Sequence, residues 1–393
     1  MPSVGTQEFV KSAVQTAHHF GFTPLERLKN HPSCKNCVEK IEHRDTAADR
    51  KNDALGGMLT SGMGSFFEYR LNGIEGPTLF YSIDQVPRTG EPAITLQIFN
   101  VRKSIGESLL IQTIRSLLRD IGYENHVVRI NSLGDTDSVT RYIRELTNFL
   151  KKRSEEMPPG ARELMKEHPL VALMHLIEKE HDLVRRSPNP LEYLTDISRK
   201  HFREIIEFLD QSKTPFEIDP KLIGHHECYS DALFAIDLKN EVGEPYETEP
   251  LYIRGGRYNT FVSKMSKAKT PAVGAVVVLK ERKSPASFPV PRMRQDPSIF
   301  MVQLGFAPKV RSLLLMDELK RSGISVQQNV TSDSLSEQLR LAESKNAEYA
   351  IIIGQKEFVE NRVILRNLRL QTQVMVPFAS LSEHLHRVAK VAA

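Results

Sequence analysis

The sequence predicts an α/β protein made of two domains and a linker, and three observations lead to that fold class. Between residues 251 and 282, an apolar strand pattern, two glycines, a short helical pattern and a second apolar strand follow one another. Four prolines then fall between residues 284 and 297, which is typical of a linker. After them, strand and helix patterns alternate, as in a mostly parallel sheet covered by helices. We therefore expect domains at residues 1–283 and 297–393, joined by residues 284–296.

Length, charge and cysteine content limit the classes of protein to consider. The 393 residues suffice for two or three domains, and the net charge of +4 permits a nucleic-acid partner without requiring one. No apolar run reaches the ~20 residues of a membrane-spanning helix, and the first residues lack the apolar core of a signal peptide. Three cysteines, an odd number, argue against a disulfide framework. We expect a cytoplasmic protein that does not contact a membrane.

The first elements are a helix and a cysteine-containing segment. Apolar positions at helical spacing predict a helix over Thr6–Phe20. Cys34 and Cys37 form a Cys-x-x-Cys pattern that can bind one zinc ion, and His31 or His43 can complete a tetrahedron. The alternative is a solvated helix start that carries thiols. We favour this alternative because the second Cys/His pair of a strong zinc motif is missing.

Hydrophobic periodicity predicts the remaining elements. Before the linker, the predicted strands are Leu79–Tyr81, Ile94–Val101, Val127–Ile130, Leu251–Ile253 and Ala272–Leu279, and the predicted helices are Ser108–Leu118, Val139–Leu150 and Ser198–Asp210. After it, the strands are Ser298–Gln303, Ile324–Gln327, Tyr349–Ile353, Val363–Arg366 and Gln371–Pro377, and the helices are Ala307–Ser322, Leu335–Ser344 and Leu381–Ala392.

The segment around the paired glycines resembles a family motif. The runs Gly255–Tyr258 and Pro271–Gly274, separated by a short helical pattern, are similar to the third signature motif of histidyl-tRNA synthetases, which are class II aminoacyl-tRNA synthetases. Paired glycines after a strand let the backbone turn sharply and let a ligand approach closely. The residues that we expect to line the substrate pocket here are Gly255, Gly256, Arg257 and Tyr258.

The resemblance extends over nearly the whole chain, in the same order. Asn131–Gly134 after a strand and Ile218–Pro220 before another are similar to the family sequence. The resemblance implies an α+β catalytic domain with the antiparallel sheet of class II synthetases and a helical insertion at residues 135–212. It also implies an anticodon-binding-like α/β domain at the C-terminus, and a homodimer.

Several family positions are changed, so the chain resembles a diverged member with degenerate catalytic motifs. Gly224 stands in place of the catalytic arginine, which in the family contacts the α-phosphate of ATP. Gln97, Glu227 and Tyr229 stand at positions of the substrate pocket. The adjacent run His225–Cys228 offers a second possible metal site, which we rank below a simple surface turn because neighbouring histidines tend to point apart.

The ATP-binding arginines of the family also lack clear counterparts. Arg88 lies near the first of these positions but follows a proline. Glu281 occupies the position of the last ATP-binding arginine, and Arg282 lies one residue beyond it. An offset of one residue in a strand or helix points the side chain in a different direction. Adenylyl transfer needs positioned cations to bind and stabilise negative charge. ATP and Mg²⁺ are therefore expected cofactors only if the protein is active.

The expected partner is tRNA, most simply histidine tRNA. Arg362, Arg366 and Arg369 lie close together near a predicted strand end and can contact RNA phosphates, although a solvated edge strand is the alternative. The favoured hypothesis is a tRNA-binding protein with little or no histidine activation. The first alternative is an active histidine–tRNA ligase, and the second resembles the regulatory subunit of ATP phosphoribosyltransferase, a family without the C-terminal domain.

Overall fold

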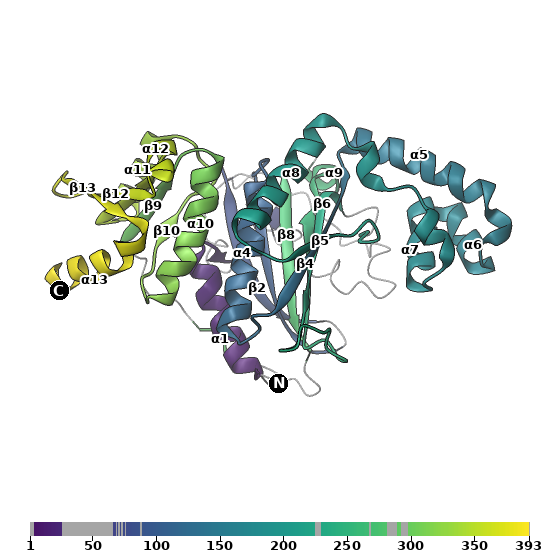
Figure 1. The fold of residues 1–393 in the computed structure, drawn as a ribbon, viewed down its shortest axis with the longest axis horizontal. Helices are drawn as coiled ribbons and strands as arrows, with labels where there is room; N and C mark the ends of the chain where they lie inside the picture. Colours follow the sequence, from purple (N-terminus) through teal and green to yellow (C-terminus); the bar gives the residue numbers. More distant parts are fainter. Residues whose placement is uncertain are drawn as a thin grey trace.

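The computed structural model describes residues 4–25, 66–67, 69, 71, 74, 76–86, 89–224, 229–266, 269–280, 289–291 and 298–392. Within them lie an eight-stranded sheet, in the order β1-β2-β3-β8-β7-β6-β4-β5, and a five-stranded sheet, in the order β10-β9-β11-β12-β13. Figure 1 shows the second sheet and its helices on the left and a group of helices at the opposite end. The predicted linker lies mostly outside the described residues.

The large sheet is antiparallel over its six central strands, as predicted. Its strands are β1 (Thr23–Pro24), β2 (Thr78–Gln85), β3 (Pro92–Phe99), β4 (His126–Gly134), β5 (Phe216–Ile218), β6 (Ser230–Leu238), β7 (Leu251–Arg257) and β8 (Ala272–Leu279). Only the edge strands β1 and β5 pair in parallel with their neighbours. β3 and β8 are buried throughout, so both faces of the sheet centre are covered.

Three helices cover one face of this sheet: α1 (Thr6–His19), α4 (Ile105–Asp120) and α8 (Asp196–Gln211). Every residue of α4 from Ile105 to Leu118 is buried, because α4 packs against β8, α1, α8 and a helix of the C-terminal part. A helix enclosed on all sides is expected to be apolar around most of its circumference. The charged residues that α4 does bury must therefore be paired.

The predicted helical insertion is confirmed between β4 and β5 (Figure 1). It contains α5 (Thr136–Lys152), α6 (Pro159–Glu167), α7 (Pro169–Glu178), three short 3₁₀ turns and then α8. Local chemistry sets the helix starts. Asp135 and Thr195 accept hydrogen bonds from backbone N–H groups at the starts of α5 and α8, and α6 and α7 begin with prolines, which lack the N–H that would be unpaired there.

The C-terminal sheet is mixed, so the prediction of a mostly parallel sheet is wrong. Its elements are β9 (Ile299–Gln303), α10 (Phe306–Arg321), β10 (Gln327–Gln328), α11 (Leu335–Ser344), β11 (Tyr349–Ile353), α12 (Gln355–Val359), β12 (Arg362–Asn367), β13 (Gln373–Pro377) and α13 (Leu381–Ala392). β9 pairs in parallel with β10 and β11, but β12 is antiparallel to both of its neighbours. The connections around β12 are too short for a parallel crossover.

The predicted sharp turn at the paired glycines is also wrong. Strand β7 continues through Gly255 and Gly256 to Arg257. The glycines serve close packing instead: a Cβ on Gly255 would lie 2.3 Å from the ring of Phe234, and one on Gly256 would lie 2.9 Å from the carbonyl oxygen of Ala232. Because real Cβ atoms do not approach other atoms so closely, only glycine fits at either position.

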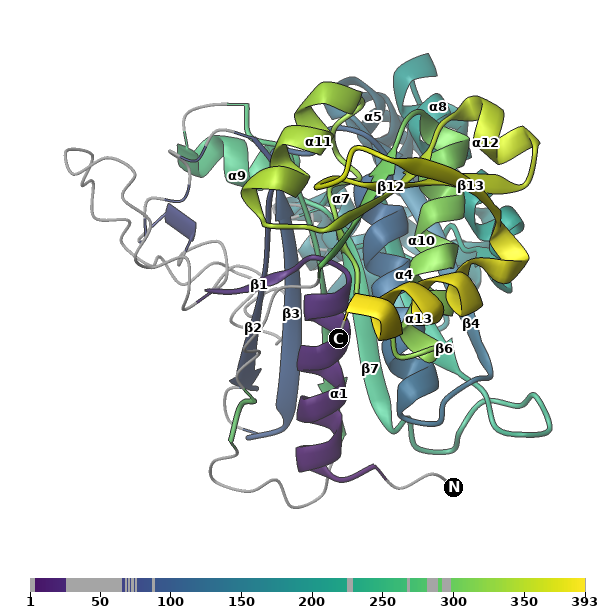
Figure 2. The same ribbon diagram turned by 90° about the vertical axis from the view of Figure 1, so that its left-hand side faces the viewer.

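Helix α10 docks the C-terminal part onto α1 and α4, and Figure 2 shows α10 alongside α4. Arg119 forms an ion pair with Asp317, and Lys320 forms one with Asp120. The Nε2 atom of His19 lies 2.8 Å from the carbonyl oxygen of Met316. In the described part of the chain, no helix is both long and apolar enough to cross a membrane.

Candidate functional site

Two predicted pocket residues, Gln97 and Gly256, lie in one row across the large sheet. Gln97 on β3 pairs with Gly274 on β8, which pairs with Gly256 on β7. The Tyr258 hydroxyl donates a hydrogen bond to Gln97 Oε1 above this row, and a Cβ on Gly274 would lie 2.7 Å from that hydroxyl. Gly274 therefore leaves the space that the buried Tyr258 side chain fills.

A pocket of about 410 Å³ opens on the same sheet face, next to this row. It brings together Gly224, Tyr229 and Gly255, which are far apart in sequence, and it also contains Arg129 and Arg254. Its size lies in the range of ~300–1,000 Å³ that small-molecule sites occupy. The predicted pocket residues Gly224, Tyr229 and Gly255 thus share one cavity.

Tyr229 fills the space next to Gly224. A Cβ on Gly224 would lie 2.3 Å from Cδ2 of Tyr229 and 2.7 Å from Cδ2 of Leu233. Any larger side chain at position 224 would require the aromatic ring to move. The packing around position 224 therefore leaves no room for a side chain as large as arginine.

Two arginines of the pocket differ in whether nearby carboxylates neutralise their charge. Arg129 donates to Asp219 at 3.0 Å and forms a second ion pair with Asp237; these hydrogen bonds raise its pKa. Arg254 has no carboxylate partner among the described residues. Its Nε donates to the Tyr252 hydroxyl at 3.2 Å, and its guanidinium carbon lies 5.2 Å from the centre of that ring. The buried Nη1 of Arg254 has no hydrogen-bond partner among the described residues.

Arg257, which we expected beside a ligand, is 1% exposed and bound within the protein. Its Nε and Nη2 donate to Glu107 at 2.7 and 2.6 Å, and its Nη1 donates to the carbonyl oxygen of Val101 at 2.7 Å. His201 Nε2 lies 2.8 Å from Glu107 Oε1. Burial by itself raises the pKa of Glu107, but the Arg257 charge and His201 outweigh burial and lower this pKa to about 2. A role of Arg257 in substrate binding stays a prediction.

The other predicted site residues are either outside the described residues or on the C-terminal sheet. Those outside are Cys34, Cys37, His43, Arg88, Glu227 and Arg282. Among the described residues, no three His, Cys, Asp or Glu side chains are grouped as metal ligands would be. The predicted zinc site and ATP contacts therefore stay predictions.

The three arginines predicted to bind RNA lie on β12 and the turn after it. Arg362 forms an ion pair with Glu360, Arg366 donates to Gln371 Oε1, and Arg369 is exposed. The first two are thus held by neighbours, and only Arg369 extends freely from the turn. Their contact with RNA stays a prediction.

Arg254 and Glu107 were not among the predicted site residues. Each is a charged residue in an element that is largely buried in the folded chain. A buried charge must be paired or functional. Whether such a charge is paired or functional depends on its partner in the folded chain. The sequence does not show that partner, because Glu107 is 150 positions away from Arg257.

The large antiparallel sheet with a C-terminal α/β part is the architecture expected from the resemblance to class II aminoacyl-tRNA synthetases. A family model described as the anticodon binding domain matches residues 311–387. The histidine–tRNA ligases of Halalkalibacterium halodurans and Geobacillus kaustophilus are each 26% identical to this chain, over 68% and 77% of its length. The chain is thus similar to histidyl-tRNA synthetases, which belong to class II.

The similarity does not extend over the whole of these relatives. The matches span 62% and 68% of the two ligases. A solved structure of apo histidyl-tRNA synthetase from S. aureus is 17% identical, covers 82% of this chain and 80% of that chain, and superposes with a TM-score of 0.47.

Proposed function

We propose that this protein binds tRNA and activates histidine weakly or not at all. One observation supports the proposal: Tyr229 fills the space that a side chain at position 224 would need, and the family resemblance implies that the catalytic arginine would stand there. Adenylate formation places negative charge on the α-phosphate of ATP, and losing one positioned group that stabilises such charge typically costs about 10²–10³-fold in rate. Without that cation, the pocket is poorly suited to the first step of aminoacylation.

tRNA binding is supported by the anticodon binding domain match over residues 311–387. Arg362, Arg366 and Arg369 in this region are the proposed contacts to RNA phosphates, with histidine tRNA as the proposed partner. The docking of α10 on α1 and α4 would hold this surface at a constant distance from the pocket. We further propose a cytoplasmic homodimer, as the family resemblance implies. The alternative of a regulatory subunit is less favoured, because the protein carries this C-terminal domain.

An active histidine–tRNA ligase, using ATP and Mg²⁺, remains the second candidate because of Arg254. This residue lies in the same pocket as Gly224 and Tyr229, and its buried Nη1 has no hydrogen-bond partner among the described residues. A guanidinium is well suited to bind phosphate oxygens. Arg254 would then replace the missing arginine from a neighbouring strand.

Histidine-dependent exchange of labelled pyrophosphate into ATP separates the two candidates. We expect exchange at background level in the wild-type chain, together with salt-sensitive binding of histidine tRNA. Exchange that disappears in Arg254→Ala but persists in Arg144→Ala, an exposed arginine on α5, would establish the ligase instead. Arg257→Ala is unsuitable for this test because it breaks the buried ion pair with Glu107. Absence of tRNA binding at low salt would refute the proposed function.

A further inference from the structure

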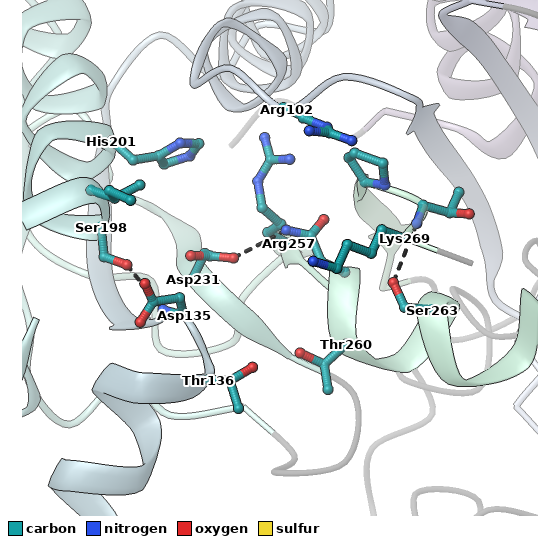
Figure 3. A pocket seen from close by; sticks show the side chains of 14 residues that line it. Arg102, Asp135, Thr136, Ser198, His201, Asp231, Arg257, Thr260, Ser263 and Lys269 are labelled. Carbon is teal, nitrogen blue, oxygen red and sulfur yellow. Dashed lines mark hydrogen bonds between the residues drawn. The ribbon is translucent and has the colours of Figure 1, made fainter. Parts of the chain in front are cut away.

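A second pocket, of about 580 Å³, opens between the first turns of α5, α8 and α9 (Asn259–Ser266) (Figure 3). No described residue lines both this pocket and the one beside Gly224. The size is suitable for a small ligand. The pocket is therefore a separate candidate site at the ends of strands β6 and β7.

Asp231 is directed into this pocket by an irregularity in the sheet. The register of β6 shifts against β4 between Ser132 and Gly134, and against β7 between Ser230 and Leu233. Asp231 lies at this shift with a φ of +53°, a conformation that residues other than glycine rarely adopt. Such bulges redirect side chains and are common next to functional sites.

The Asp231 carboxylate retains capacity to accept hydrogen bonds. Figure 3 shows it facing the centre of the pocket, where Asn259 Nδ2 donates to its Oδ2 at 3.1 Å. A carboxylate has about four acceptor positions, so this one hydrogen bond leaves capacity for others. Burial raises the pKa of this carboxyl, so a ligand that donates hydrogen bonds to it would relieve an unfavourable environment.

Two cations lie on the opposite wall. Arg102 follows β3 and Lys269 precedes β8, and within the described residues neither forms an ion pair. Figure 3 shows both side chains on the side of the pocket opposite to His201. Arg257 also lines the pocket, but Glu107 neutralises it. A ligand anion would therefore be bound by Arg102 and Lys269.

The rim also has an apolar part. Ile197 on α8 lines the pocket and is 79% exposed, and Pro271 lies at the start of β8. An aliphatic side chain at a pocket rim can pack against the ring of a bound ligand, which removes both surfaces from water. The pocket thus offers a carboxylate, two cations and an apolar surface.

We propose that this pocket binds a ribonucleotide, with its phosphate on Arg102 and Lys269, its ribose hydroxyls on Asp231 and its base against Ile197 and Pro271. A carboxylate that accepts from ribose hydroxyls is a recurrent feature of nucleotide sites, and arginine and lysine are the usual partners of phosphate. An inorganic anion alone would meet repulsion from Asp231 and gain nothing from the apolar rim. The inference goes beyond the proposed function and does not depend on it, because the residues involved are different.

Calorimetric titration of the full chain with adenosine 5′-monophosphate tests the proposal. We expect binding that is about tenfold weaker for the 2′,3′-dideoxy analogue, the loss expected for charge-assisted hydrogen bonds. Asp231→Asn keeps a residue type that tolerates the left-handed conformation, so it should fold, and it should remove most of that discrimination. Arg102→Ala should weaken the monophosphate about tenfold and leave adenosine unaffected.

Arg144→Ala serves as the control and should leave the affinity unchanged, while Arg254→Ala reports on any binding in the pocket beside Gly224. Three results would overturn the proposal: no binding, equal affinity for inorganic phosphate and the monophosphate, or binding that Arg254→Ala abolishes while Asp231→Asn and Arg102→Ala do not. The third result would assign the nucleotide to the pocket beside Gly224. Circular dichroism of each variant confirms that any loss of binding occurs in folded protein.

Discussion

Arg257 and Glu107 form a buried ion pair that joins strand β7 to helix α4, with Arg257 Nη2 2.6 Å from Glu107 Oε2. Both side chains are almost inaccessible to water. His201 on α8 and the Val101 carbonyl satisfy further polar atoms of the pair. The arginine of the glycine-rich motif therefore acts as a structural connection between the sheet and the helices that cover it.

The first prediction concerns this pair. Replacing either partner leaves an uncompensated buried charge, so Arg257→Met and Glu107→Gln should each lower the free energy of unfolding by about 3–5 kcal/mol. Urea denaturation followed by circular dichroism measures this. The exposed Arg144→Ala should change the same quantity by less than ~0.5 kcal/mol. Equal stability of Arg257→Met and the wild type would show that the pair contributes nothing.

The second prediction is the acid dependence of stability. The pKa of Glu107 is lowered to about 2 from an ordinary value of 4.5, so the unfolded chain binds the proton first as the pH falls. The stabilisation is present above pH 4.5 and is lost as the pH falls towards about 2, by about 3 kcal/mol in total. Urea midpoints measured between pH 5 and 2.5 should fall less steeply in Glu107→Gln. If the urea midpoint falls equally steeply with pH in the wild type and in Glu107→Gln, the acid dependence does not come from Glu107.

The third prediction concerns His19 at the contact with α10. Burial lowers the pKa of His19 from 6.5 to about 4, so this ring is neutral in the folded protein at pH 7. Stability is full above pH 6.5 and declines as the pH falls through about 4, since the unfolded chain takes up the proton first. Replacing His19 by Gln should flatten the pH dependence of the unfolding midpoint between pH 7 and 4.5. The matched control is His386→Gln at an exposed histidine, and this variant should keep the pH dependence of the wild type.

The fourth prediction concerns the packing of Tyr229 on Gly224. Gly224→Ala should destabilise the protein by about 1–3 kcal/mol, because the new methyl group would meet the aromatic ring. The same substitution in a Tyr229→Ala background should cost less. Gly5→Ala, where nothing lies within 4 Å of the added carbon, is the control and should be nearly neutral. If Gly224→Ala behaves like Gly5→Ala, Tyr229 does not exclude a side chain from position 224.

Most elements were predictable from the sequence because their signals are local. β8, α11, β11 and α13 have the predicted bounds, since apolar periodicity and flanking glycine or proline residues define them. The antiparallel large sheet and the helical insertion were predicted through the resemblance to a family. The mixed pairing of the C-terminal sheet was not, because strand periodicity is the same in parallel and antiparallel sheets.

The sequence by itself determined the order of the elements and the resemblance to a family, because periodicity and motif order are properties of neighbouring residues. Only the tertiary structure decided the roles of the site residues. Gly255 and Gly256 make room for packing within a strand, Arg257 pairs with Glu107 from a distant segment, and Asp231 is redirected by a shift in register. These outcomes depend on which distant atoms meet in the folded chain, and no local pattern encodes that.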